Sequence, residues 1–293
     1  MIKKTIVLSF ILLSGIVNAS AQWRVFQNEM GKFGLELEIE SGEIIRRINA
    51  KYDSILFCDN PNVTNDFDLY IPISENRIGV KLGISWGFID TSGREITPIK
   101  YDKIGPYSNG FAWVQRKGKQ TWVNFSGKEI SPFLFDCQPN TKFQEGKCKI
   151  SINRSWGFID TTGKIIVQPR YRNVGNFSDQ LAWVQNGSSG NFGYINEAGV
   201  EVIPATRDYA KVYPFSEGLA AIETPFMDEE DPGILHLLIG FINKKGELVI
   251  PFQFQSGINY FENEYKFKND RLKVTLKDGK EVIINRKGEI IQN

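Results

Sequence analysis

One octapeptide recurs almost unchanged in this chain, as WGFIDTSG at residues 86–93 and as WGFIDTTG at residues 156–163. A chain that repeats one segment folds into similar units placed side by side, so this feature constrains the fold most. The Gly that ends each related block recurs with spacings of 51, 34, 36, 36, 47 and 42 residues. The seven positions are Gly42, Gly93, Gly127, Gly163, Gly199, Gly246 and Gly288.

A second recurring segment precedes most of these blocks and has the alternating pattern of a β-strand. It reads YSNGFAWVQ at 107–115, FSDQLAWVQ at 177–185 and FSEGLAAIE at 215–223, and WRVFQ at 23–27 fits its last part. Each repeat then offers three strands, FAWVQ, WGFID and REITPI, the last ending near Pro98. Strands of ~5 residues between Gly-containing turns, without helical periodicity, predict an all-β chain.

A single hairpin unit of this length is too small to bury its own apolar face, so neighbouring units must stack. We expect about seven tandem β-hairpin repeats in an elongated or superhelical array. The alternative is closure into a seven-bladed β-propeller, whose blades normally have four strands in ~40 residues or more. Three strand signals in spacings of 34–36 residues favour the open array. The degenerate first and last copies are typical of capping repeats.

The segment WGFIDTSGREITPIKYDKIGPYSNGFAWV resembles the WG repeat, also called the KWG repeat, of a bacterial β-repeat family. The motif fits residues 86–112 and 156–184, and it fits 192–223 with Phe192 in place of Trp. The copies at 120–150 and beyond 239 lack the WG pair. The resemblance implies a repeat scaffold of unknown ligand rather than an enzyme. The matching positions of the best copy are Trp86, Gly87, Gly93, Pro98, Tyr101, Asp102 and Gly110.

The N-terminus has the pattern of a secretory signal peptide. Lys3-Lys4 precedes an apolar run at 5–17, and Ala19-Ser20-Ala21 forms a small-x-small cleavage site. The apolar run is shorter than the ~20 residues of a membrane span. We therefore expect residues 1–21 to be removed, and residues 22–293 to form one WG-repeat β domain. The mature protein is expected in the periplasm or outside the cell.

The composition argues against several classes of function. Without the signal segment, 33 basic residues face 34 acidic ones, so no long-range field attracts nucleic acid or an anionic membrane. Of three cysteines, Cys137 and Cys148 are the nearer pair for a bridge, or Cys148 fills a small inward position as a hydrophobe. The lone His236 does not support a multi-His metal site. The acidic insert MDEED at 227–231 is expected to be a solvated loop, and no metal or cofactor is expected.

Comparison of the copies separates turn chemistry from catalysis at the Asp of WGFID. This position alternates between Asp and Asn, which a catalytic or metal-binding carboxylate does not tolerate. Asp or Asn three residues before Gly is typical of a turn, in which the side chain binds its own backbone and Gly takes the left-handed conformation. The aligned residues are Asp90, Asn124, Asp160, Asn196, Asn243 and Asn285, and the turn glycines include Gly93, Gly163 and Gly199.

The WG pair itself is expected to pack between repeats. The aromatic position holds Trp86, Trp156 and Phe192 in the central copies, which suits contact with a neighbouring repeat. The glycine that follows lets backbones or the ring approach closely. These glycines are Gly87, Gly157 and Gly193.

The candidate binding residues are Trp113 and Trp183. Their position holds Gly79, Trp113, Lys149, Trp183 or Ala221 in the five copies, a mixture that predicts a solvent-facing surface. Exposed aromatic rings on a β-surface stack on sugars or on a partner's side chains. Tyr107 and Phe177 are the candidates for the rim of this site. In the alternative interpretation, the two Trp rings cover a gap between strands.

Enzyme signatures are lacking: the sequence contains no nucleophile elbow, P-loop, HExxH or Cys with a paired His. Carboxylate pairs distant in sequence leave a hydrolase on a β-scaffold open. We therefore expect an exported, non-catalytic scaffold that binds a protein or glycan partner through an exposed aromatic face. A periplasmic hydrolase and a purely structural envelope protein are the alternatives.

Overall fold

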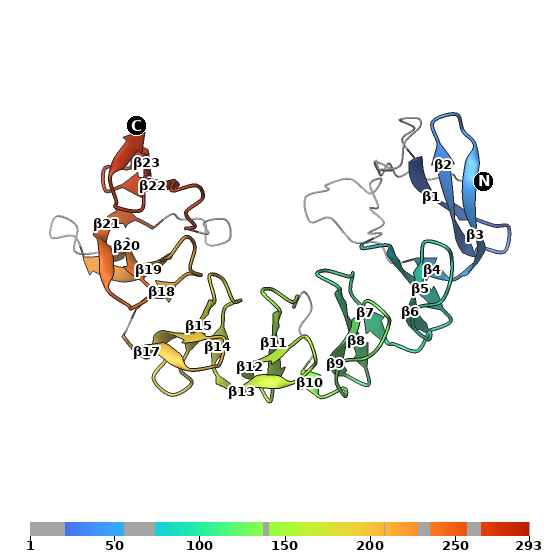
Figure 1. Cartoon of the computed structure of the whole chain (residues 1–293), viewed down its shortest axis with the longest axis horizontal. Coiled ribbons are helices and arrows are strands. Elements are labelled where there is room, and N and C mark those ends of the chain that lie inside the picture. Colours follow the sequence, from blue (N-terminus) through green and yellow to red (C-terminus); the bar gives the residue numbers. More distant parts are fainter. Residues whose placement is uncertain are drawn as a thin grey trace. The chain divides into compact units, whose positions relative to one another are not determined.

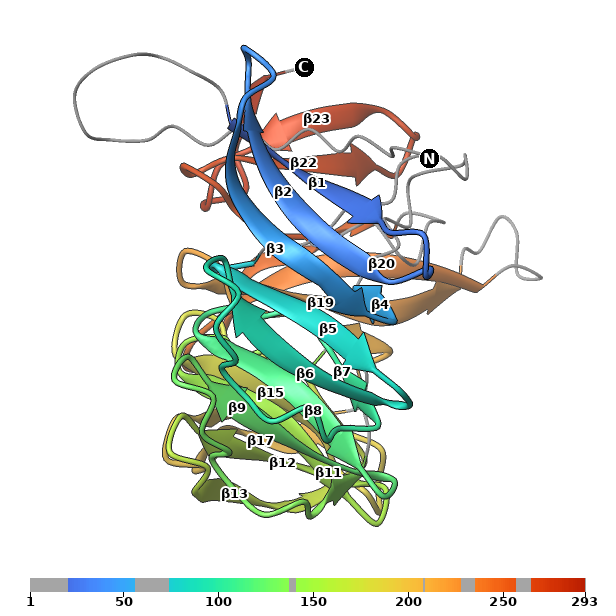
Figure 2. The same ribbon diagram turned by 90° about the vertical axis from the view of Figure 1, so that its right-hand side faces the viewer.

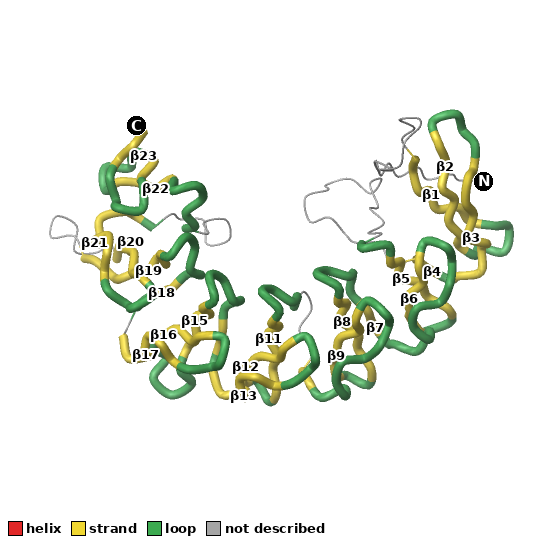
Figure 3. The backbone as a smooth tube through the Cα atoms, viewed as in Figure 1, coloured by secondary structure: helices red, strands yellow, loops and turns green. Residues whose placement is uncertain are grey.

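A computed structural model describes residues 21–55, 74–136, 141–207, 209–227, 235–256 and 265–292. Within them all regular structure is β-strand, joined by turns and loops (Figure 3), so the all-β prediction is confirmed. No described segment forms a helix long and apolar enough to cross a membrane. Residues 1–20 of the predicted signal peptide lie outside the described residues. The chain divides into two compact units, unit 1 (Met1–Lys142) and unit 2 (Phe143–Asn293).

The described residues of unit 1 form three small antiparallel sheets (Figures 1 and 2). In strand order they are β1-β2-β3, β4-β5-β6 and β7-β8-β9-β10. The strands are β1 (Ala21–Gln27), β2 (Phe33–Ile39), β3 (Ile44–Tyr52), β4 (Ser54–Ile55), β5 (Arg77–Leu82), β6 (Ser85–Asp90), β7 (Lys103–Ile104), β8 (Phe111–Arg116), β9 (Lys119–Asn124) and β10 (Phe135–Asp136).

Unit 2 continues the same pattern in three further antiparallel sheets. Their orders are β11-β12-β13, β14-β15-β16-β17 and β18 through β24 in sequence. The strands are β11 (Lys147–Ile152), β12 (Ser155–Asp160), β13 (Ile165–Tyr171), β14 (Asn173–Val174), β15 (Leu181–Gln185), β16 (Phe192–Asn196), β17 (Glu201–Arg207), β18 (Lys211–Val212), β19 (Leu219–Met227), β20 (Leu235–Asn243), β21 (Leu248–Gln255), β22 (Leu272–Leu276), β23 (Glu281–Ile284) and β24 (Ile290–Gln292).

The first repeat begins where the sequence places it, because WRVFQ lies in β1 and pairs with the block KFGLELEI along β2. The expected third strand REITPI is wrong, since residues after Gly93 form only isolated bridges. The physical reason is that the side chain of Thr97, instead of a backbone carbonyl of a third strand, accepts the hydrogen bond from the WGFID strand. The hydroxyl of Thr97 accepts the N–H of Phe88 at 2.9 Å, where Phe158 in the next WGFID copy pairs with Val167 of β13.

Within each unit, consecutive sheets share a buried core. In unit 1, Phe88 and Tyr101 share a core with Ala112, Val114 and Val123 of the following sheet. The WGFID block therefore supplies the residues of one face, and the FAWVQ block of the next repeat supplies the residues that cover them. In unit 2 the same core forms between Phe158 and Tyr171 on one side and Ala182, Val184 and Ile195 on the other.

The first and last sheets carry charges where inner sheets carry apolar residues. Glu36 of β2 stands at the position of Ile89 and binds Arg47 at 3.2 Å, and Arg24 binds Glu38 at 2.5 Å. On β22 and β23, Lys273 binds Glu281 at 2.6 Å. Charged pairs of this kind are typical of the polar outer faces of terminal repeats in a stacked β-array.

Candidate functional site

The Asp or Asn that ends each WGFID block holds the following turn through its Oδ1 atom. Oδ1 of Asp90 accepts the N–H groups of Ser92 at 2.9 Å and Arg94 at 3.0 Å. Oδ1 of Asn196 accepts the N–H groups two and four residues later, both at 3.0 Å. The turn glycines are left-handed, with φ of +85° at Gly93 and +75° at Gly199. The same Oδ1 bonds are made by Asn124, Asp160, Asn243 and Asn285.

An amide and a carboxylate serve this turn equally well because only an acceptor oxygen is needed. In the two Asp copies the surroundings also change the pKa of the carboxyl group. Burial raises the pKa of Asp90, but bonds from the Ser92 hydroxyl and from the N–H groups of Arg94 and Ser92 outweigh it, so its pKa lies below the ordinary value. The pKa of Asp160 is lowered in the same way by Thr162 and Lys164.

We predict that acid destabilises the protein through these turns. A carboxyl whose pKa is lower in the folded state stabilises the fold above its unfolded pKa of about 4, and this stabilisation is lost as the pH falls through the folded pKa. The free energy of unfolding, measured with urea between about pH 6 and pH 3, should fall less in Asp90→Asn/Asp160→Asn than in the unchanged protein. An equal fall in both proteins would contradict the assignment.

Trp113 and Trp183 lie half-buried across glycines of the segment before them. A methyl group built on Gly105 would lie 2.0 Å from Nε1 of Trp113, and one built on Gly175 would lie 2.1 Å from Nε1 of Trp183. The ring of Trp183 also meets Phe192 edge-to-face, with centroids 5.9 Å apart. The two indoles therefore cover backbone, and ligand contact through their exposed edges stays a prediction.

In the repeat that contains β19, the large and the small residue of the Trp–Gly pair are exchanged. Ala221 stands at the Trp position and is fully buried, and Tyr213 stands at the position of Gly105. The hydrogen bond between the two positions is the same, since the N–H of Tyr213 donates to Ala221 at 3.0 Å and that of Gly105 to Trp113 at 2.9 Å. One large and one small side chain thus fill the same space in either order.

The expectation that this position faces solvent is wrong. Gly79 and Ala221 are buried, and Trp113, Lys149 and Trp183 are half-buried. Burial lowers the pKa of Lys149. For Trp113, Trp183 and Ala221, the size of the residue is matched by the size of its partner on the neighbouring segment.

The expectation that Tyr107 and Phe177 form the rim of an exposed site is also wrong, because both are buried. Tyr107 packs edge-to-face on Phe88 with centroids 4.9 Å apart, and Phe177 packs on Phe158 at 4.8 Å. Burial raises the pKa of Tyr107 to about 12. The aromatic residue that begins YSNGFAWVQ and FSDQLAWVQ therefore packs its repeat against the preceding WGFID block. The sequence alone did not indicate this role.

The WG pair lies in the packing between repeats. Trp86 and Trp156 are half-buried against the cores that their sheets share with the next sheet, and Phe192 occupies the same place on β16. The glycine after each aromatic residue leaves room for the outer segment of the same repeat. A methyl group on Gly157 would lie 2.3 Å from the carbonyl oxygen of Val167. At Gly87 and Gly193 the nearest backbone atoms would lie at 2.9 and 2.5 Å.

A row of carboxylates links the hairpin turns that precede the FAWVQ strands. Both central residues of each turn have positive φ, as in type I′ turns. Glu145 accepts the N–H groups of Asp179 at 3.0 Å and Gln180 at 3.1 Å, both in the next repeat. Asp179 in turn accepts the N–H of Gly218 at 2.7 Å. The recurring acidic residue or Asn in FSDQ, FSEG and YSNG was the sequence signal for this row.

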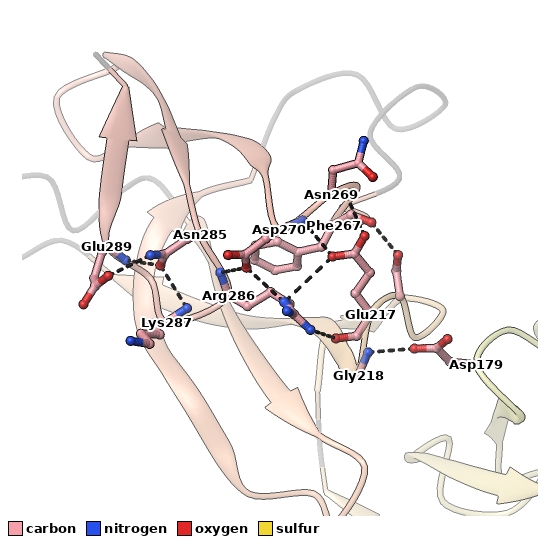
Figure 4. A network of polar contacts seen from close by, with 11 residues as sticks. Asp179, Glu217, Gly218, Phe267, Asn269, Asp270, Asn285, Arg286, Lys287 and Glu289 are labelled. Carbon is pink, nitrogen blue, oxygen red and sulfur yellow. Dashed lines mark hydrogen bonds and ion pairs between the residues drawn. The ribbon is translucent and has the colours of Figure 1, made fainter.

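The last carboxylate of this row, Glu217, lies beside Arg286 (Figure 4). Glu217 accepts the N–H groups of Asn269 at 2.6 Å and Asp270 at 2.9 Å. Arg286 donates through Nε to Asp270 at 2.9 Å and through Nη1 to the carbonyl of Glu217 at 3.2 Å. These acidic side chains are therefore occupied in holding consecutive repeats of unit 2 together.

The remaining chemical candidates are few. Cys148 is buried in β11 at the small inward position, and its possible partner Cys137 lies outside the described residues. Residues 228–231 of the acidic insert also lie outside them. His236 is half-buried in β20. In the described parts of the chain, no three His, Cys, Asp or Glu side chains gather as metal ligands.

An apolar row on the outer strands of unit 2 was not expected from the sequence. We call this the outer-strand row: Val200, Val202, Leu248, Val249, Ile290 and Ile291, which are 38–56% exposed. Consecutive outer strands are neighbours, because each turn glycine lies against a buried residue of the outer strand before it. A methyl group on Gly246 would lie 3.2 Å from Ile203, and one on Gly288 would lie 3.0 Å from Ile250. The row therefore recurs at the start of the outer strand in successive repeats.

The resemblance to the WG repeat is confirmed, because the family model described as "WG containing repeat" matches residues 86–119, 156–188, 192–224 and 239–265. No curated protein matches the chain. Similar solved structures include BamB from Moraxella catarrhalis, at 11% identity over 90% of this chain and 83% of that one, with a TM-score of 0.37. Hsv2 from Kluyveromyces lactis is 13% identical over 89% of both chains, with a TM-score of 0.35. AztD from Citrobacter koseri is 14% identical over 93% of this chain and 94% of that one, with a TM-score of 0.33.

Proposed function

We propose that this chain, in which the WG-repeat model matches four segments, is an exported, non-catalytic scaffold that binds a protein partner along the outer strands of unit 2. The supporting observation is the outer-strand row, whose six aliphatic residues are partly exposed in consecutive repeats. Stacking within each unit buries the facing sides of consecutive sheets, which leaves strand edges and hairpin tips for recognition. An exposed apolar row on a monomer marks an interaction site.

A protein partner suits this row better than a glycan. Sugar recognition uses aromatic rings together with convergent polar groups, whereas the row consists of Val, Leu and Ile. A partner's apolar side chains gain the most from such a surface, because its burial removes aliphatic area from water. Trp113 and Trp183 stay a second candidate contact through the exposed edges of their rings.

A non-catalytic role agrees with the uses already found for the acidic groups. Asp90 and Asp160 hold turns, and Glu145, Asp179 and Glu217 hold the next repeat through its N–H groups. A hydrolase needs carboxylates aimed at a shared substrate site. Export agrees with the signal-peptide pattern of residues 1–21.

The proposal predicts that one lysine in the outer-strand row weakens partner capture. The protein and Val249→Lys are used as baits on an envelope and secreted-protein extract of the source cells, and recovered proteins are compared. A partner bound through the row should be recovered at least about tenfold less with Val249→Lys, because a charge replaces an apolar contact. Far-UV circular dichroism checks that the variant is folded.

Two further baits complete this experiment. Ser188→Lys adds the same charge on the exposed hairpin between β15 and β16 and should recover the partner fully. Trp113→Ala/Trp183→Ala tests the aromatic edges. If every variant recovers the same proteins as the unchanged bait, the outer-strand row is not the binding surface, and a structural role in the envelope is favoured.

A further inference from the structure

Two hairpin tips of unit 1 expose large apolar side chains. Met30, between β1 and β2, is 81% exposed, and Ile84, between β5 and β6, is 89% exposed. Leu82 beside Ile84 is 47% exposed. We call these three residues the apolar tips. They lie outside the outer-strand row and outside every buried core cluster of unit 1.

Turn chemistry does not require these residues. Gly83, with φ of +62°, supplies the special backbone conformation of its two-residue turn, and Ile84 follows it. The equivalent residue in the hairpin between β11 and β12 is Arg154, so the repeat does not dictate an apolar side chain there. At the other tip, Asn28 Oδ1 accepts the backbone N–H groups of Met30 at 3.1 Å and Lys32 at 2.9 Å, so the turn uses the backbone of Met30 and not its side chain.

One carboxylate brings the two tips together. Asp53 binds Nζ of Lys32, at the β1–β2 tip, at 2.5 Å through Oδ1. Its Oδ2 accepts the N–H of Gly83, at the β5–β6 tip, at 2.6 Å. Both tips therefore project from the same edge of unit 1 (Figure 2).

Basic side chains, together with acidic ones, lie on the hairpins that carry the apolar tips. Lys32 and Lys81 lie directly beside them, and the next hairpin along the chain carries Arg116, Lys117 and Lys119. This third tip is held beside the others through Asp102, which accepts the N–H of Lys117 at 2.6 Å. The residue before it, Tyr101, is tied to β6, because its carbonyl accepts the N–H of Trp86 at 2.8 Å. Lys32 and Lys119 are paired with Asp53 and Asp136 and Glu29 precedes Met30, so the positive charge offered at this edge comes from Lys81, Arg116 and Lys117.

We infer that this edge of unit 1 docks on an anionic lipid membrane surface. Protruding apolar side chains insert between lipid headgroups, and Lys and Arg behind them are attracted to anionic lipids. The tips are convex and lie on separate hairpins, which suits a deformable bilayer better than the flat or concave surface of a protein partner. The docking requires no membrane-spanning segment and is independent of partner capture by unit 2.

The test uses the mature chain, residues 22–293, in flotation with phosphatidylglycerol-containing vesicles and with pure phosphatidylcholine vesicles. The unchanged protein should bind only the anionic vesicles, and about 0.5 M salt should weaken binding. Met30→Gln/Ile84→Asn should lose at least about tenfold in affinity, and Arg116→Glu/Lys117→Glu should lose a similar factor. Ile84→Leu keeps the apolar group and should bind as the unchanged protein does.

The matched control is Leu248→Gln/Val249→Asn, which removes two exposed aliphatic side chains from unit 2 and should leave vesicle binding unchanged. Failure of the unchanged protein to bind anionic vesicles would overturn the inference, as would full binding by Met30→Gln/Ile84→Asn. Vesicle binding absent together with reduced protein capture by Met30→Gln/Ile84→Asn would assign the tips to a protein partner instead. Because capture by the outer-strand row is measured with Val249→Lys, the two proposals fail separately.

Discussion

Replacement of Phe177 by alanine is expected to lower the free energy of unfolding by about 3–5 kcal/mol, the cost typical of a Phe→Ala change in a core. The ring is buried and packs edge-to-face on Phe158 with centroids 4.8 Å apart. Its loss removes both the apolar burial and the contact that joins two consecutive repeats. The measurement is urea unfolding followed by circular dichroism and by tryptophan fluorescence.

The control for this prediction is Val200→Ala, which shortens a side chain that is 56% exposed. It should change the free energy of unfolding by no more than about 0.5 kcal/mol. A loss below about 1 kcal/mol for Phe177→Ala would place the ring at an accessible surface, against the burial described above.

A methyl group added at Gly157 is expected to destabilise the protein by about 1–3 kcal/mol. The new Cβ would lie 2.3 Å from the carbonyl oxygen of Val167 and 2.8 Å from the nitrogen of Pro169, both backbone atoms. Backbone cannot rotate away as a flexible side chain does, so β12 and β13 must separate where Gly157 forms their bulge. Urea unfolding of Gly157→Ala measures the loss.

Gly240→Ala is the matched control, because the same position in β20 has more room. There the nearest atom, the carbonyl oxygen of Ile250, would lie at 3.0 Å. The loss for Gly157→Ala should therefore exceed that for Gly240→Ala. Equal or reversed losses would show that the close approach of the outer strand does not explain the glycine after the aromatic residue.

Turn chemistry was predictable from the sequence because it depends on neighbours within four residues. Comparison of Asp90 with Asn196 already showed that the side chain needs an acceptor and not a charge, and the Oδ1 bonds have that form. The left-handed φ of Gly93 follows from the same local rule. The all-β class was predictable for a similar reason, since strand length and turn spacing are local properties.

Burial was harder to predict because it depends on which segments meet in space. The mixture of Gly79, Trp113 and Ala221 at one position suggested a solvent-facing site, yet the sizes of Trp113 and Ala221 are matched by those of the residues across from them. Trp113 covers Gly105, whereas Ala221 makes room for Tyr213. Comparison of single columns of the repeat does not reveal a pair whose volumes compensate, because the two members are separated in sequence.

The sequence by itself determined that the chain is a β-repeat protein, where each turn falls and which side chains hold it. These features follow from local backbone preferences and from repetition of one short pattern. Only the tertiary structure decided that Tyr107 and Phe177 belong to the core, that acidic side chains link consecutive repeats, and that Met30 and Ile84 protrude. Those outcomes depend on how one repeat stacks on the next, because stacking alone determines which apolar side chains are removed from water.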